Sequence, residues 1–151
     1  MFVFQRFYRF TTTFIVLFAA LPAWAETLAI HTDDGQRYDF EVEVASTPQE
    51  KARGLMFRKS LPPFTGMVFQ HDGTPGFGFW MKNTLIPLDM LFIDRQGVIR
   101  HIHPNAQPMS ETSISWPGRT WIAVEIPGGS TEELEIEVGD TATLLEEETQ
   151  P

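Results

Sequence analysis

Residues 37–44 read Arg-Tyr-Asp-Phe-Glu-Val-Glu-Val, and their alternation decides the class of fold. Every second residue from Tyr38 to Val44 is apolar, and the residues between them are acidic. A period of two places the apolar side chains on one face of an extended strand and the acids on the other. The preceding residues 33–36 (DDGQ) form a turn signal, and residues 28–31 before them are mostly apolar. The pattern therefore predicts a half-buried β-hairpin.

Further strands are expected at short, regular intervals along the chain. Apolar or alternating segments bounded by glycine, proline or aspartate turn signals occur at residues 66–70, 77–81, 88–93, 98–103, 120–126 and 141–145. Many short strands with frequent turns are typical of a β-sandwich or barrel. We therefore predict a mainly β, single-domain β-sandwich or jelly-roll-like barrel over residues 26–151.

One short helix is expected at residues 48–53. Thr47 can cap it, Pro48 suits the first helical position, and Glu50 can return a hydrogen bond to the cap. Gly54 offers a left-handed stop, and residues 55–57 (LMF) should then enter the core. A second, ambiguous segment follows Ser130, which could cap a brief helix.

The first 25 residues resemble an export signal. They carry two arginines and no acid, then the apolar run FIVLFAAL, then Ala-Trp-Ala at residues 23–25. This arrangement predicts a secretory signal peptide cleaved after Ala25, and hence a periplasmic or secreted protein. The apolar run is shorter than the roughly 20 residues that cross a bilayer, so we expect no stable membrane span after cleavage. An uncleaved membrane anchor is the alternative.

Composition removes several classes of function. The 151 residues contain 11 basic and 20 acidic side chains, a formal net charge of −9, and no cysteine. A chain this acidic is poorly suited to bind nucleic acid. Without cysteine it can have no disulfide, thiolate zinc site or cysteine nucleophile. No serine lies in a nucleophile-elbow pattern, and the glycines near residue 76 lack a phosphate-loop lysine. We expect no cofactor.

The middle of the chain resembles the DUF192 family, also called UPF0127, whose members are uncharacterised. The resemblance covers roughly residues 40–145, and its most distinctive element is Trp-Met-Lys-Asn-Thr at residues 80–84. It implies a compact β-sandwich of jelly-roll type, often behind a signal peptide, and implies no activity. Gly129 departs slightly from the family pattern. The segments that carry the resemblance are residues 53–58 (RGLMFR), 66–69 (GMVF), 79–84 (FWMKNT), 86–89 (IPLD), 125–129 (EIPGG) and 138–140 (VGD).

Two carboxylates stand among apolar residues, Asp89 in residues 86–93 and Glu125 in residues 121–126. A buried charge without a partner is very costly, so these acids should be either solvated or paired with cations. Arg53 and Lys82 are the expected partners. Such a cluster could be a structural ion-pair network, or it could bind a small polar or anionic molecule. The candidate ligand-binding residues are Arg53, Trp80, Lys82, Asn83, Asp89 and Glu125, with Trp80 as an apolar wall.

Two other functions remain open. Asp89 and Glu125 could be the two carboxylates of a saccharide-acting hydrolase, which lie about 5 to 9.5 Å apart in such enzymes. Alternatively, His101 and His103 project from one face of a strand and could bind copper together with methionine sulfurs. The other candidate copper ligands are His31, His71, Met56, Met67, Met81, Met90 and Met109. The leading hypothesis is a non-catalytic exported module.

Overall fold

The computed structural model describes residues 25–145, which contain nine strands and two short helices. Their order is β1 (Ala25–His31), β2 (Arg37–Ala45), α1 (Pro48–Arg53), β3 (Thr65–Gln70), β4 (Gly78–Phe79), β5 (Leu88–Ile93), β6 (Ile99–Ala106), β7 (Ile114–Ser115), β8 (Ile122–Pro127), α2 (Ser130–Glu133) and β9 (Thr141–Leu145). The predicted signal peptide lies outside the described residues except for Ala25. No helix among residues 25–145 is both long and apolar enough to cross a bilayer.

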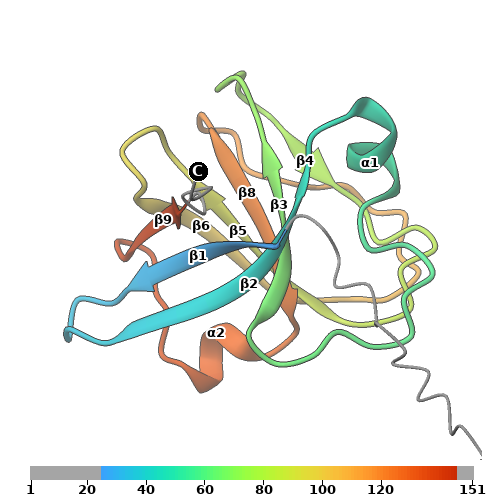
Figure 1. Ribbon diagram of the computed structural model, residues 1–151. Helices are drawn as coiled ribbons and strands as arrows, with labels where there is room; N and C mark the ends of the chain where they lie inside the picture. Colours follow the sequence, from blue (N-terminus) through green and yellow to red (C-terminus); the bar gives the residue numbers. More distant parts are fainter. Residues whose placement is uncertain (1–24, 146–151) are drawn as a thin grey trace, which may run out of the picture.

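Seven of these strands form one sheet in the order β6-β5-β8-β3-β2-β1-β9. Neighbouring strands are antiparallel except β2 and β3, whose parallel pairing follows from the crossover through α1. The sheet curls into a half-barrel, and its two edges approach each other where β6 lies beside β9 (Figure 1). Backbone hydrogen bonds join the edges there, from Ile99 N to Asp140 O at 2.8 Å and from Ala142 N to Gly97 O at 2.7 Å. The predicted mainly β barrel is confirmed.

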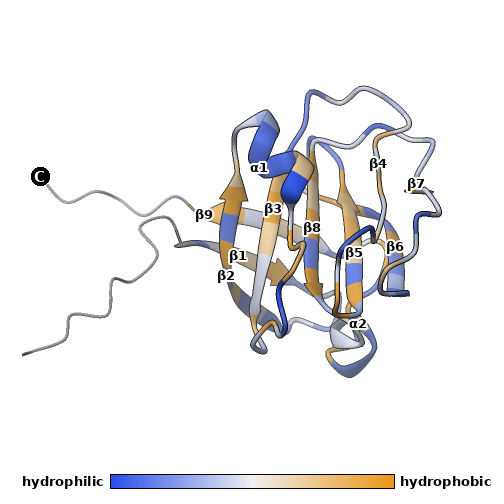
Figure 2. Cartoon of the chain, turned by 90° about the vertical axis from the view of Figure 1, so that its right-hand side faces the viewer, coloured by the Kyte–Doolittle hydropathy of each residue, from blue (hydrophilic) through white to orange (hydrophobic). Residues whose placement is uncertain are grey.

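The two faces of this sheet carry separate apolar clusters. The inner core lies inside the curl and takes side chains from both edges, including Leu28, Phe40, Val124 and Ile99. The outer core lies on the opposite face of the central strands, where Phe69 and Phe92 are covered by loop residues such as Leu61 and Ile86. Because both faces are covered, the central strands are apolar along most of their length, as the mainly orange colour of β5 in Figure 2 shows.

Local predictions agree closely with the structure. The predicted hairpin is β1 paired with β2, with Ile30 opposite Tyr38, and Phe40 and Val42 face the inner core. Helix α1 has the predicted bounds and a complete capping box between Thr47 and Glu50. These features depend on neighbouring residues, so sequence patterns suffice to predict them.

Other expectations are wrong, and each failure has a tertiary cause. Leu55 is buried as expected, but Phe57, which has φ +65° and donates its backbone N–H to Asn83 O, is 61% exposed. Ser130 does not cap α2; the N-cap residue is Gly129, and no side chain within the helix start supplies the cap. The expected strand at residues 77–81 shortens to β4, because Met81 N bonds to Ser110 O in a neighbouring loop.

Candidate functional site

Glu125 lies in the middle of a row of residues that crosses the outer face of the sheet. Strand register places Glu43 of β2 opposite Met67 of β3, Met67 opposite Glu125 of β8, Glu125 opposite Met90 of β5, and Met90 opposite His103 of β6. Side chains directly opposite in such a ladder lie side by side. Glu125 is therefore flanked on both sides by methionines, Met67 and Met90, rather than by polar groups.

This environment leaves the Glu125 carboxyl group desolvated. Glu125 is only 5% exposed, and its buried Oε2 atom has no hydrogen-bond partner. Burial raises the pKa of Glu125 from 4.5 to about 8, although the positive charge of Arg58 opposes that rise. At neutral pH the group is therefore mostly the uncharged acid, which can both donate and accept a hydrogen bond.

A small cavity of about 30 Å³ adjoins Glu125 on the side of α1. Arg53, Trp80 and Thr84 line it, and Thr84 is itself buried. Gly54 keeps the space open, because a Cβ atom there would lie 3.7 Å from Glu125 Oε2, and its φ of +49° favours glycine. The remaining lining residues are Lys51, Ala52, Leu55, Met56, Phe69 and Phe79.

The cation that is electrostatically coupled to Glu125 is Arg58, which the sequence analysis did not select. Its guanidinium donates two hydrogen bonds to Glu43, at 2.7 and 2.6 Å, from a half-buried position. The hydrogen bonds to Glu43 raise the pKa of Arg58, and the charges of Glu43 and Glu125 add to that rise. The expected pairing of Arg53 and Lys82 with the two buried carboxylates is wrong: within residues 25–145 no hydrogen bond or ion pair joins them.

Lys82 and Asn83 lie beside the cavity rather than in it. Lys82 forms an ion pair with Glu111 at 3.6 Å, and its ammonium nitrogen lies 5.1 Å from the centroid of the Trp80 ring. Asn83 has φ +57°, its carbonyl accepts from Phe57 N at 2.9 Å, and its amide contacts the Met56 sulfur. Trp80 is 47% exposed, so its indole borders both the cavity and solvent.

Among the described residues, Asp89 is buried without the cation that was expected to accompany burial, and it lies on the other face of the sheet. In register Asp89 lies opposite Ile126, whereas Glu125 lies opposite Met90, so the two carboxylates point in opposite directions. Asp89 Oδ1 accepts from Asn105 N at 2.8 Å and Gly129 N at 2.9 Å. Its Oδ2 accepts from both N and Oγ1 of Thr131, at 2.8 and 2.7 Å. Asp89 therefore ties a bulge in β6 to the start of α2, and the sheet separates it from the cavity.

The two candidate copper-binding histidines share one face of β6, as expected. His101 lies opposite Phe92 and His103 opposite Met90, and the His101 ring packs 5.5 Å from Phe92. Burial lowers the pKa of His101, with a smaller contribution from His103. No three His, Asp or Glu side chains converge in a metal-binding arrangement among the described residues.

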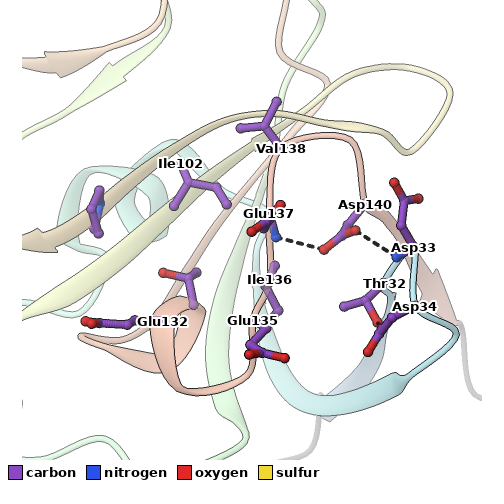
Figure 3. A pocket seen from close by; sticks show the side chains of 12 residues that line it. Thr32, Asp33, Asp34, Ile102, Glu132, Glu135, Ile136, Glu137, Val138 and Asp140 are labelled. Atoms are coloured by element: carbon purple, nitrogen blue, oxygen red, sulfur yellow. Dashed lines mark hydrogen bonds between the residues drawn. The ribbon is translucent and has the colours of Figure 1, made fainter.

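A larger hollow of about 770 Å³ lies near α2 and the β1–β2 turn. Six acidic side chains line it, and Figure 3 shows Asp140 between the two segments. Asp140 is buried and accepts from Asp33 N at 3.1 Å and from Glu137 N at 2.8 Å. Its oxygens are therefore used to join the turn to the segment before β9. The acidic lining residues are Asp33, Asp34, Glu132, Glu135, Glu137 and Asp140.

The structure thus brings together Glu125, Arg53 and Trp80 of the six candidate residues, places Lys82 and Asn83 nearby, and separates Asp89 from them. Sequence reasoning missed Arg58, Thr84 and Gly54. Arg58 and Gly54 belong to the motif at residues 53–58, and Thr84 ends the motif at residues 79–84. The motifs indicated which two segments to consider. Only the tertiary structure, in which residues of both segments lie around one cavity, shows what each residue contacts.

Comparisons with known proteins agree with this fold. A protein from Sinorhizobium meliloti 1021, described as a "putative transcription regulator", is 38% identical, with a TM-score of 0.76, over 79% of this chain and 92% of that one. A protein of unknown function from Novosphingobium aromaticivorans DSM 12444 is 37% identical, with a TM-score of 0.74, over 78% of this chain and 83% of that one. No curated protein matches. The model of one family, DUF192, described as "Uncharacterized ACR", matches residues 29–144, so this chain belongs to the DUF192 family.

Proposed function

We propose that this DUF192 domain binds a small polar molecule in the cavity beside Glu125 and does not transform it. The observation that carries the proposal is the Oε2 atom of Glu125, which is buried beside a cavity and has no hydrogen-bond partner. Leaving a buried polar group unsatisfied costs about 1–3 kcal/mol. Groups of this kind are concentrated at functional sites, where a ligand supplies the missing partner.

The environment of Asp89 supports this interpretation by contrast. Asp89 is also fully buried, yet backbone and side-chain donors satisfy both of its oxygens. The same fold therefore provides partners for both oxygens of one buried acid and leaves Oε2 of the other without one. A purely structural role would be easier to reconcile with a Glu125 that was paired in the same way.

We propose binding without catalysis because Glu125 supplies the one carboxyl group among the residues that line the cavity. The hydrolase alternative needs two carboxylates facing one substrate, at a separation of about 5 to 9.5 Å. Asp89 and Glu125 point to opposite faces of the sheet, so a substrate at Glu125 could not reach Asp89. This arrangement gives no support to the hydrolase.

Nucleic-acid binding is not part of the proposal. The description of the Sinorhizobium meliloti relative suggests transcriptional regulation for that protein. This chain carries a net charge of −9 and has no lysine or arginine after Arg119. Binding to phosphate backbones depends on clustered positive charge, which this composition does not favour.

We further propose that the protein acts outside the cytoplasm, after cleavage of residues 1–25. The basic start, short apolar run and Ala-Trp-Ala end support export. Expression of the full chain in a Gram-negative host, with N-terminal sequencing of the periplasmic product, tests this directly. A product beginning at Glu26 is expected, whereas a product that keeps Met1 and stays with the membrane would contradict it.

The binding proposal is tested by a fragment screen monitored by two-dimensional NMR. Fragments that bind should shift the amide resonances of Gly54, the indole of Trp80 and the residues around Glu125. A Glu125→Met variant should lose these shifts and remain folded, since methionine matches the volume and the flanking residues. If no fragment perturbs this region while the wild-type protein is fully folded, the proposal fails.

A further inference from the structure

The size of the cavity limits what can enter it. Its volume of about 30 Å³ is close to the share of one water molecule in the liquid, roughly 30 Å³. The cavity therefore admits only the tip of a ligand, and the rest of the molecule must lie outside. The indole of Trp80 lines the cavity, is 47% exposed, and also borders a second hollow of about 240 Å³ with Phe79 and Ser113. A flat, apolar ligand body would contact this exposed ring.

The charges that face Glu125 differ from one packed element to the next. Helix α1 contributes Lys51 and Arg53 to the lining, and the segment after it contributes Arg58, whose charge acts on Glu125. From β2, Glu43 is occupied by Arg58 in a two-fold hydrogen bond. Strand β3 presents Met67 and Phe69, and β5 presents Met90, none of which is charged.

The more distant titratable groups are either removed from the cavity or paired. His103 of β6 lies beyond Met90, one strand further from Glu125. Lys82 and Glu111, near Trp80, pair with each other. Cations therefore outnumber free anions around the opening.

These groups suit an acceptor of hydrogen bonds better than a cation. Lys51 already donates to Gln70 O at 2.6 Å, but Arg53 makes no side-chain hydrogen bond within residues 25–145. An uncharged Glu125 offers an O–H donor at the base of the cavity. An ammonium group entering the same space would meet Lys51 and Arg53 and lose energy by like-charge repulsion.

We infer that the group recognised by this site is a carboxylate on a small, flat molecule, which accepts a hydrogen bond from Glu125 and a second from Arg53 while its body lies against Trp80. The inference rests on the proposed function and specifies its ligand. A hydrogen bond from an acid to a carboxylate is charge-assisted and about twice as strong as a neutral one. Recognition of this kind requires protonated Glu125, so binding should weaken when that proton is lost.

Three matched probes test the inference: benzoate, benzyl alcohol and benzylamine, titrated into the full-length protein by calorimetry at pH 6.5 and pH 9.5. Benzoate should bind most tightly at pH 6.5. Because the pKa of Glu125 is about 8, linkage predicts a roughly 30-fold rise in the benzoate Kd at pH 9.5. Benzylamine should bind weakly at pH 6.5.

Two variants assign the effect to named groups. Glu125→Gln keeps an N–H donor without an ionisable proton, so its benzoate Kd should change less than threefold between the two pH values. Arg53→Gln should weaken benzoate binding about tenfold, whereas Lys59→Gln, which removes an exposed charge outside the lining, should leave it unchanged. Equal pH dependence in the wild type and Glu125→Gln would overturn the role of Glu125.

The outcomes separate the two proposals. If benzylamine, or the amines and neutral molecules of the fragment screen, bind at Glu125 better than carboxylates, recognition of a carboxylate is excluded and the binding site stands. If no probe or fragment binds near Glu125 at either pH, both proposals fail together.

Discussion

Asp89 and Glu125 lie on neighbouring strands of one sheet and are both buried, yet their carboxyl groups point to opposite faces. Asp89 accepts four hydrogen bonds from the β6 bulge and the start of α2. The buried Oε2 of Glu125 accepts none and borders a cavity. One acid therefore holds two segments of the fold together, while the other keeps an unused capacity for hydrogen bonding.

The first prediction concerns the pH dependence of folding. Since the pKa of Glu125 is raised to about 8 in the folded protein, its contribution to stability is fully present below about pH 4.5 and is lost as the pH rises through 8. Between those values this group should lower the free energy of unfolding by about 1.4 kcal/mol per pH unit. Urea denaturation of wild type and Glu125→Gln at pH 5, 7 and 9 measures this.

Glu125→Gln should lose much less stability over that range and should be the more stable protein at pH 9. Other titrating groups affect both proteins equally, so the difference between the two curves isolates Glu125. Parallel curves with the same slope would show that Glu125 is ionised and solvated in the folded state.

The second prediction is that Asp89, unlike Glu125, stabilises the protein as a charged group, so neutralising it lowers the free energy of unfolding. Asp89→Asn makes the same chemical change, but it directs an amide NH₂ at backbone N–H donors and weakens charge-assisted hydrogen bonds. We expect a loss of about 2–4 kcal/mol at pH 7, measured by urea denaturation.

Hydrogen exchange tests the structural explanation of that loss. The amides of Gly129 and Thr131 should exchange faster in Asp89→Asn, because Asp89 accepts from both. A variant as stable as the wild type, with unchanged protection at these two amides, would show that these bonds do not hold α2 in place.

The third prediction concerns Arg58. Removing its charge in Arg58→Gln should raise the pKa of Glu125 above about 8, because Arg58 is the cation that opposes the desolvation of that group. Carboxyl ¹³C chemical shifts followed over a pH titration measure the midpoint. Lys59→Gln is the control for a general loss of positive charge, and an equal shift in both variants would exclude a specific effect of Arg58.

The fourth prediction compares two adjacent aromatic residues. Phe79 packs between Phe69 and Phe77, each ring centroid 5.0 Å away, so Phe79→Ala should destabilise the protein by about 2–4 kcal/mol. Trp80 is half exposed, so Trp80→Ala should change stability by only about 0.5–1 kcal/mol. Trp80→Ala should nevertheless weaken benzoate binding at least tenfold, and unchanged binding would remove Trp80 from the site.

Predictions from sequence succeeded where the cause is local. The alternation from Tyr38 to Val44 and the capping box between Thr47 and Glu50 involve residues a few positions apart, and both occur as expected. The cap of α2 was assigned wrongly to Ser130 because the group that binds its first amides, Asp89, is about 40 residues away. No local pattern contains that information.

The candidate site was predicted only in part, because local patterns indicate which residues lie in apolar segments but not which distant residues they contact. The apolar neighbours of Glu125 within its own strand left two environments open, solvated or buried with a cation, and the structure shows that Glu125 is buried. The expected partners of Glu125, Arg53 and Lys82, were wrong. Arg58 lies in the same basic part of the chain, and no sequence pattern shows which of the three cations approaches Glu125. Packing decides among them: Glu43, on the outward face of β2, holds Arg58 in place.

The amino-acid sequence by itself determined most of the strands, the helix at residues 48–53 and the placing of two acids in apolar segments, because periodicity and capping act between near neighbours. Only the tertiary structure decided that these acids face opposite sides of the sheet and that one of them lacks a partner. Alternation along a strand tells which residues share a face, but the pairing of β5 with β8 decides which face that is relative to a distant residue. The cavity beside Glu125 likewise exists only because α1, the segment around Trp80 and strand β8 meet there.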